Sequence, residues 1–99
     1  MEPEFLITIE EFCVKYEIDV SFINSLHQYG LIKIITVKEI GFIDACQLQQ
    51  LEKFIHLYYE LDINIEGIET IDSLLHRINK MKTEITWLKN KLQIYEGEL

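Results

Sequence analysis

The side chains that most often do chemistry in proteins are few in this chain and stand apart. His27, His56 and His76 fall on three different expected helices, and Cys13 and Cys46 follow no CxxC or CxH spacing. A zinc site needs such ligands to converge, and a Cys–His nucleophile needs the two side chains paired. Nothing in the spacing favours either arrangement. We therefore expect no metal site, and we expect both cysteines to be small apolar core residues.

Carboxylate pairs and phosphate loops give no stronger signal for catalysis. The pairs Glu10/Glu11 and Asp62/Glu66 are interpreted as helix-cap or surface residues, and the sequence contains no Gly-rich phosphate loop and no Ser elbow. An active site also needs a concave pocket, which a small core forms with difficulty. The sequence therefore predicts a protein that is not an enzyme and that binds no cofactor.

Two short helices are expected at the start of the chain. Thr8 followed three residues later by Glu11 is a capping box, and apolar residues then recur at helical spacing as far as Tyr16. A turn over residues 18–21 follows, in which Asp19 or Ser21 caps a second helix. Two short helices joined by a tight turn are typical of a helix-turn-helix.

A small hairpin is expected after the second helix. Gly30 stands where a left-handed residue commonly ends a helix. The runs 31–37 and 40–43 are short and rich in β-branched residues, which favours two strands with their turn near Lys38 and Glu39. This hairpin would form a wing beside the two helices.

Two further helices are expected in the rest of the chain. Asp44, with Gln47 at the capping-box position, predicts a third helix that runs to Leu61. Asn64 can cap a fourth helix, which contains Gly67 near its start. Because a glycine weakens a helix, Gly67 is expected to permit a close approach between helices.

The tail has the clearest periodicity in the sequence. Apolar or aromatic residues fill both seam positions of four successive heptads, which is typical of a coiled coil. We therefore expect a head over residues 1–70, a coiled-coil helix over residues 71–99, and a homodimer formed through that helix. The predicted dimerisation residues are Ile71, Leu74, Ile78, Met81, Ile85, Leu88, Leu92 and Tyr95.

The charge balance restricts the class of partner. The 99-residue chain has a net charge of −8, and its first 70 residues hold four bases and thirteen acids. Such a surface repels phosphate backbones and attracts basic partners, so binding to nucleic acid is unfavoured. No stretch of 18 apolar residues exists, and the acidic start lacks the basic segment of a secretory signal. We expect a cytoplasmic protein with no membrane partner.

The predicted order of elements is similar to the MerR-like winged helix-turn-helix, and the fold class expected is mainly α. The chain differs from that family at two positions where a positively charged side chain is expected. MerR-type regulators carry an arginine in the second helix, where this chain has Asn24-Ser25-Leu26-His27, and another in the wing, where Gly41-Phe42 is followed by Ile43. DNA affinity depends chiefly on neutralised phosphates, so both losses count against a DNA-binding role.

A closer resemblance involves four segments. These are Ile9-Glu10-Glu11-Phe12-Cys13, Gly30-Leu31, the run from Tyr59 to Ile68, and Leu74-Leu75-His76-Arg77-Ile78. Together they resemble the CbpM-type chaperone modulators, which are MerR-like proteins without a DNA role. The resemblance implies binding to the J-domain of a DnaJ/CbpA-like co-chaperone. J-domains contain a basic helix, and the bound protein would inhibit or tune the co-chaperone's stimulation of Hsp70 (DnaK).

An acidic surface is the expected contact for such a partner. Charge complementarity would speed association while apolar contacts supply affinity. For each acid the alternative is an ordinary solvated charge, which is the common state of exposed carboxylates. Tyr59 also has two interpretations: it can be an interface anchor, or it can pack at the edge of the core. The candidate partner-binding residues are Glu52, Tyr59, Glu60, Asp62, Glu66 and Glu69.

Two other functions are consistent with the sequence. A MerR-like transcriptional regulator would use the same fold to bind DNA, although the expected cations are missing. A coiled-coil adaptor would bind partners through the tail alone.

Overall fold

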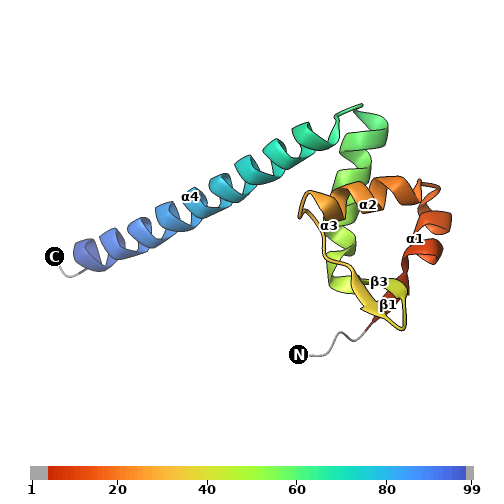
Figure 1. The fold of residues 1–99 in the computed structure, drawn as a ribbon. Helices are drawn as coiled ribbons and strands as arrows, with labels where there is room; N and C mark the ends of the chain where they lie inside the picture. Colours follow the sequence, from red (N-terminus) through yellow and green to blue (C-terminus); the bar gives the residue numbers. More distant parts are fainter. Residues whose placement is uncertain (1–4, 98–99) are drawn as a thin grey trace. The chain divides into compact units, whose positions relative to one another are not determined.

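The computed structural model describes residues 5–97 of the chain. Figure 1 shows helices and short strands in its first part and one long helix, α4, in its second. The chain divides into two compact units, the first ending at Glu69 and the second beginning at Thr70. The first unit is called the head below.

The helix-turn-helix is present as α1 (Ile9–Tyr16) and α2 (Val20–Gln28). The Thr8 hydroxyl accepts the Glu11 N–H at 3.1 Å, as the capping box predicts. Glu17 ends α1 with a left-handed φ of 55°. Asp19 holds the N-cap position of α2, but its side chain makes no cap hydrogen bond.

The expected hairpin is also present, inside a larger sheet. Strands β2 (Ile35–Val37) and β3 (Ile40–Asp44) pair antiparallel, with Val37 opposite Ile40. The turn residues Lys38 and Glu39 both have positive φ, 51° and 66°. That geometry matches the twist of a two-residue hairpin. A third strand, β1 (Leu6–Thr8), pairs with the other edge of β3 and was not expected from the sequence.

The third helix differs from the prediction in its start and its end. It consists of a 3₁₀ turn η1 (Ala45–Gln47), α3 (Leu48–Ile55) and a π-helical turn η2 (His56–Glu60). Asp44 caps η1 through the Cys46 N–H. The prediction that Gln47 completes a capping box was wrong. Its side-chain amide instead bonds the backbone N–H and C=O of Lys33 at 2.8 and 2.9 Å, which ties η1 to the segment before β2.

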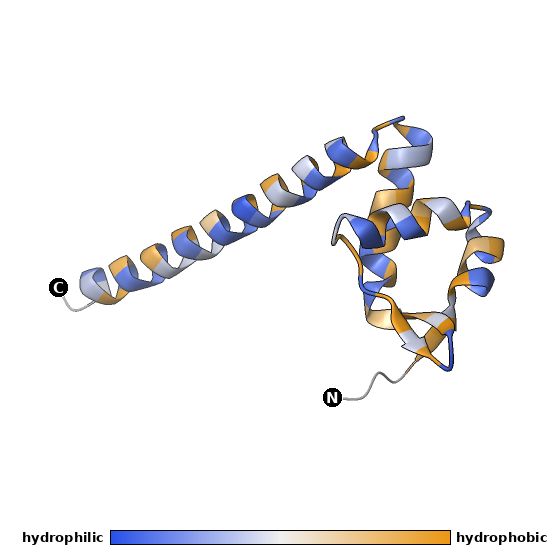
Figure 2. Cartoon of the chain, viewed as in Figure 1, coloured by the Kyte–Doolittle hydropathy of each residue, from blue (hydrophilic) through white to orange (hydrophobic). Residues whose placement is uncertain are grey.

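Helix α4 (Ile65–Gly97) begins as predicted, because the Asn64 side chain accepts the Gly67 N–H at 2.8 Å. Gly67 does not serve an approach between helices. A Cβ at this position would lie 2.7 Å from Ile63 Cγ2 and 3.0 Å from Asn64 Oδ1, so the glycine makes room for the loop that caps its own helix. Figure 2 shows polar and apolar patches alternating along α4.

The core of the head is built from α1, α2, α3, the first turn of α4, the strand β3 and the segment before β2. Cys13 is buried in it as expected, but Cys46 is exposed, because it lies in the short turn η1 outside the core. No described helix is long and apolar enough to cross a membrane. The buried core residues are Phe12, Cys13, Phe22, Ile23, Leu26, Ile32, Ile43, Leu51, Phe54 and Ile68.

Candidate functional site

The winged face of the head is the surface that a helix-turn-helix protein presents to DNA. In that motif the N-terminal residues of the second helix contact base edges. In this chain the corresponding residues Val20, Ser21 and Asn24 on α2 are exposed, and α2 contains neither lysine nor arginine. In the wing, from Ile35 to Asp44, Lys38 is the one basic residue. The face therefore lacks the positive charges that would neutralise phosphates.

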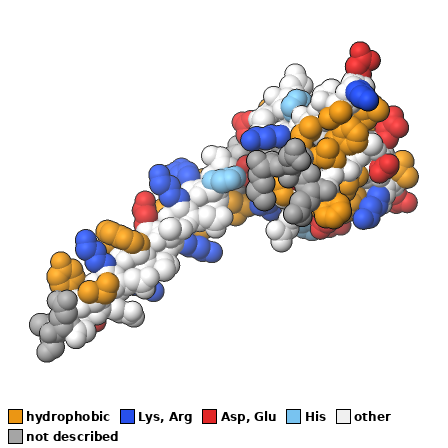
Figure 3. Space-filling view, turned by 90° about the horizontal axis from the view of Figure 1, so that it is seen from below, with side chains coloured by type: hydrophobic (Ala, Val, Ile, Leu, Met, Phe, Trp, Pro, Cys, Tyr) orange, Lys and Arg blue, Asp and Glu red, His pale blue; other side chains and the backbone are white. Residues whose placement is uncertain are grey.

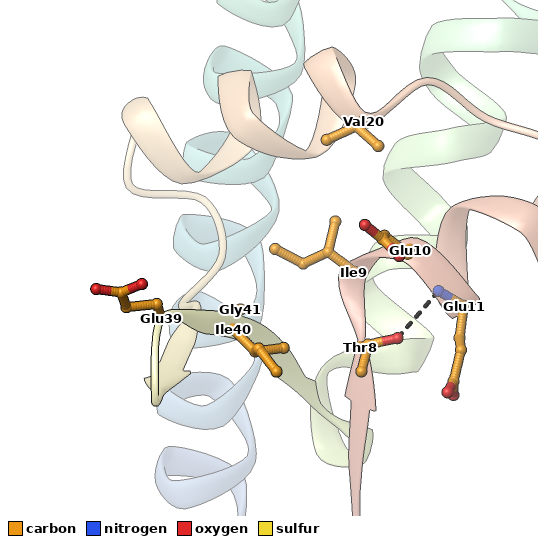
Figure 4. Close-up of a pocket in the computed structure, with 8 residues that line it drawn as sticks. All are labelled: Thr8, Ile9, Glu10, Glu11, Val20, Glu39, Ile40 and Gly41. Carbon is orange, nitrogen blue, oxygen red and sulfur yellow. Dashed lines mark hydrogen bonds between the residues drawn. The ribbon is translucent and has the colours of Figure 1, made fainter.

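A hollow of about 570 Å³ lies between the wing turn and the N-terminal ends of α1 and α2. In Figure 4, the Val20, Ile9 and Ile40 side chains from three different elements point into the same space, while the Glu39 carboxylate points away from them. Val20 and Ile40 are 43% and 52% exposed. The hollow is lined by Thr8, Ile9, Glu10, Glu11, Val20, Glu39, Ile40 and Gly41.

The charge of this hollow is unfavourable for a nucleic acid. Glu10, Glu11 and Glu39 are among its lining residues, so a phosphate placed there would meet like charge. Glu10 and Glu11 are adjacent, but Glu39 lies 28 residues further along the chain, so the spacing of these acids does not indicate that they share one face.

The six candidate partner-binding residues are all exposed, and they come from α3, η2, the following loop and α4. Tyr59 and Asp62 line one hollow at the C-terminal end of η2. Glu60 lies between them in sequence, and its carboxylate is hydrogen-bonded to the His56 ring, four residues earlier. Glu69 is exposed in the second turn of α4.

Two of the candidate acids also have structural partners. The Tyr16 hydroxyl donates to the Glu52 carboxylate at 2.8 Å, which links α1 to α3. The Tyr29 hydroxyl donates to Glu66 at 2.7 Å, which links the end of α2 to α4. Each bond raises the pKa of its tyrosine, and the bond from Tyr29 lowers the pKa of Glu66. Each carboxylate thus gives part of its hydrogen-bonding capacity to the head.

Tyr59 contributes to packing as well as to the surface. Its hydroxyl accepts the Asp19 N–H at 3.1 Å, so it satisfies the backbone N–H of the N-cap residue of α2. Its ring lies edge-on to Phe22 at 5.4 Å between centroids, and it remains 42% exposed. Tyr59 therefore packs at the edge of the core, as one interpretation predicts, and the exposed part of its ring remains a candidate interface anchor.

The predicted dimerisation residues form an apolar stripe on α4. Ile71 is half-buried, and the other seven are between 42% and 64% exposed in the single chain. The face shown in Figure 3 has hydrophobic side chains beside lysine and arginine along the length of α4. An exposed stripe with heptad spacing is the pattern that a coiled-coil partner covers. Trp87 lies off this stripe with the Lys91 ammonium 4.8 Å from its ring centroid.

The described residues contain no group of three or more His, Cys, Asp or Glu side chains that could hold a metal ion. His56 is paired with Glu60, and His76 contacts Asp72 in α4. Burial raises the pKa of the Cys13 thiol, and a hydrogen bond with Asp44 raises that of Cys46. Raised pKa values make both thiols poor nucleophiles at neutral pH.

Comparison with protein families matched residues 7–90 to the model of the MerR HTH family regulatory protein. No curated protein and no solved structure matched the chain in the corresponding comparisons. The matched range includes both helices of the helix-turn-helix, the wing, α3 and most of α4.

Proposed function

Since the chain belongs to the MerR helix-turn-helix family of regulatory proteins, we propose that it regulates by binding a protein in place of DNA. The partner proposed is the J-domain of a DnaJ/CbpA-like co-chaperone, and the effect is to inhibit or tune the stimulation of Hsp70 (DnaK). The resemblance to CbpM-type chaperone modulators supplies the identity of this partner.

The observation that carries the proposal is the winged face. A DNA-binding member of this fold needs cations on its second helix and wing, and each neutralised phosphate contributes nearly one unit to the salt dependence of binding. Here α2 has none, and the hollow beside it is lined by three glutamates and by exposed Val20 and Ile40. This combination disfavours a phosphate backbone, and so argues against DNA, while the surface proposed for the J-domain is the separate set of acids from α3 to the start of α4.

The mechanism follows from charge and competition. A basic helix of the J-domain would be attracted by the acidic residues of the head, and this attraction mainly increases the association rate and sets orientation. Apolar and aromatic contacts, such as the exposed edge of Tyr59, would supply most of the affinity. While that helix is occupied it cannot dock on Hsp70, so stimulation falls in proportion to the bound fraction.

A titration of the full-length chain with purified J-domain tests the proposal. The charge-reversal variant Asp62→Lys/Glu69→Lys changes two exposed acids of the predicted surface. It leaves the bonds of Glu52 and Glu66 to tyrosines intact. We expect its association rate at low salt to fall roughly tenfold, with a weaker dependence on salt.

The matched control is Glu10→Lys/Glu39→Lys, which makes the same charge change on the winged face. Like Asp62, Glu39 has a positive φ, so the two variants carry similar backbone strain. Equal losses from both variants would show that only net charge matters. Absence of J-domain binding by the unaltered chain at tens of micromolar would refute the proposal.

DNA binding is the second candidate, because the family match covers the helix-turn-helix itself. An electrophoretic shift with duplex DNA at low salt, with excess non-specific competitor, separates the two functions. We expect no sequence-selective complex. A complex that survives competition and weakens with a steep salt slope would support the second candidate.

A further inference from the structure

The π-helical turn η2 and the loop after it border an open surface hollow of about 340 Å³ in the head, lined by Tyr58, Tyr59, Asp62, Ile63 and Asn64. One water molecule has a share of ~30 Å³ in the liquid, so the hollow has room for the end of a long side chain. No lining residue is basic. The lining residues are two tyrosines, one aspartate, one isoleucine and one asparagine.

The two tyrosines form a rigid aromatic corner. Their ring centroids are 5.0 Å apart and the rings are inclined by 75°. Both rings pack on buried Phe22, at 4.5 and 5.4 Å, and the Tyr59 hydroxyl is fixed by the Asp19 N–H. The corner is therefore organised before any ligand arrives, which lowers the entropic cost of binding.

The backbone of this segment is itself unusual. A π-helical turn is rare and is frequently found at functional sites, since its wider turn places consecutive side chains differently from an α-helix. Asp62 then adopts a left-handed φ of 54°, a conformation that non-glycine residues seldom take. Asp62 lines the same hollow as Tyr58 and Tyr59, which are four and three residues earlier in the chain.

An aromatic corner beside a carboxylate is complementary to one kind of side chain. Cations are attracted to the faces of tyrosine rings, and arginine is the more frequent partner because its planar guanidinium stacks and can also bond a carboxylate with two N–H groups. Within residues 5–97, the lysines found over aromatic rings are Lys15 at Tyr16 and Lys91 at Trp87. The rings of Tyr58 and Tyr59 are therefore not covered by a lysine from the described part of the chain.

We propose that this hollow receives one arginine side chain from the basic helix of the protein partner. The guanidinium lies against the Tyr58 and Tyr59 rings and donates to the Asp62 carboxylate. The inference rests on the proposed function for the identity of the partner, and it adds the group that is recognised and the place where it binds.

The test uses the full-length chain and two probes. One is the purified J-domain, and the other is a synthetic peptide of its basic helix, prepared with arginine and with the neutral isostere citrulline. Binding is followed by the NMR shifts of the Tyr59 and Asp62 amides and of the tyrosine rings. We expect shifts at these positions with the arginine peptide and about three- to fivefold weaker binding of the citrulline peptide.

Three variants test the hollow. The first removes its carboxylate charge, the second removes a tyrosine hydroxyl, and the third is a control outside it. Asp62→Asn keeps the size of the side chain and tolerates the left-handed backbone, and we expect it to weaken the arginine peptide by about three- to fivefold and the citrulline peptide hardly at all. Tyr59→Phe keeps the ring and should bind nearly as the unaltered chain does. Glu39→Gln removes one charge on the winged face and is the matched control, with unchanged binding expected.

The outcomes distinguish this inference from the function on which it rests. If the J-domain binds but Asp62→Asn changes neither affinity nor the preference for arginine, the hollow is not the site and the inference fails. If the arginine peptide shifts Tyr59 and Asp62 while the J-domain does not bind, the hollow is supported and the proposed partner is wrong.

Discussion

Tyr29 and Glu66 show at the scale of single residues why an acidic side chain cannot be assigned to a partner from sequence alone. They are 37 positions apart, and neither belongs to a local motif that connects them, yet the hydroxyl donates to the carboxylate at 2.7 Å. Tyr16 and Glu52 repeat the arrangement at 2.8 Å. Two of the acids that the sequence offered as a contact surface thus also hold helices of the head together.

The Tyr29–Glu66 bond makes a prediction about protonation. Because the hydrogen bond favours the ionised carboxylate, the pKa of Glu66 is lowered and that of Tyr29 is raised. Tyr29→Phe should therefore return the pKa of the Glu66 carboxyl towards its usual range. An NMR pH titration of the glutamate side-chain carbons measures this directly, and Tyr95→Phe is the control, with no change expected at Glu66. An unchanged titration of Glu66 in Tyr29→Phe would contradict the bond.

The direction of the pH dependence follows from the same two shifts. The contribution of Glu66 to stability is present above the pKa of the unfolded chain and is lost as pH falls through its lower folded value. The contribution of Tyr29 is present below its unfolded pKa and is lost as pH rises through its higher folded value. The pair therefore stabilises the head most across neutral pH and less at both extremes.

At the scale of elements, the features set by neighbours in sequence were predictable. Thr8 and Asn64 cap helices through the N–H groups three residues on, and both hydrogen bonds are present. The hairpin was confirmed with its turn at Lys38 and Glu39, although neither residue is a usual choice for positive φ. Short-range spacing carries this information, because the atoms that bond are close along the chain.

Features set by distant contacts were not predictable. Strand β1 has three residues and too little alternation to be recognised, and it exists because β3 offers it an edge. Gln47 has the spacing of a capping residue but bonds Lys33, 14 positions earlier. The π-helical turn η2 and the hollow beside it depend on the packing of Tyr58 and Tyr59 against Phe22. The sequence named Tyr59 and Asp62 as candidates, but not the corner they share.

The cap of α4 gives a prediction at this scale. Asn64→Ala removes the acceptor of the Gly67 N–H, and we expect the free energy of unfolding to fall by about 1 kcal/mol. Asn79→Ala makes the same change in the middle of α4, where alanine is the better helix former, so it should be neutral or slightly stabilising. Chemical denaturation of the three proteins measures both effects. Equal stabilities for the two variants would show that the cap contributes nothing.

At the scale of the whole molecule, charge and the apolar stripe point to different partners. The first 70 residues carry −9, and the tail from residue 71 carries five bases and four acids. We propose that the head meets a basic partner, whereas the nearly neutral tail, with its seven exposed seam residues, pairs with a second copy of itself. The two roles are separable, because a change in the stripe does not alter the charge of the head.

That separation can be tested with Ile78→Asp. Ile78 is 42% exposed in the single chain and occupies the middle of the stripe, so a carboxylate there would be desolvated only in the dimer. We expect the proposed dimer to lose several kcal/mol of association free energy, enough to give monomers at micromolar concentration. Thr83→Asp adds the same charge on the opposite side of α4 and should leave association unchanged. Sedimentation equilibrium measures both proteins, and a persisting Ile78→Asp dimer would place the self-association surface elsewhere.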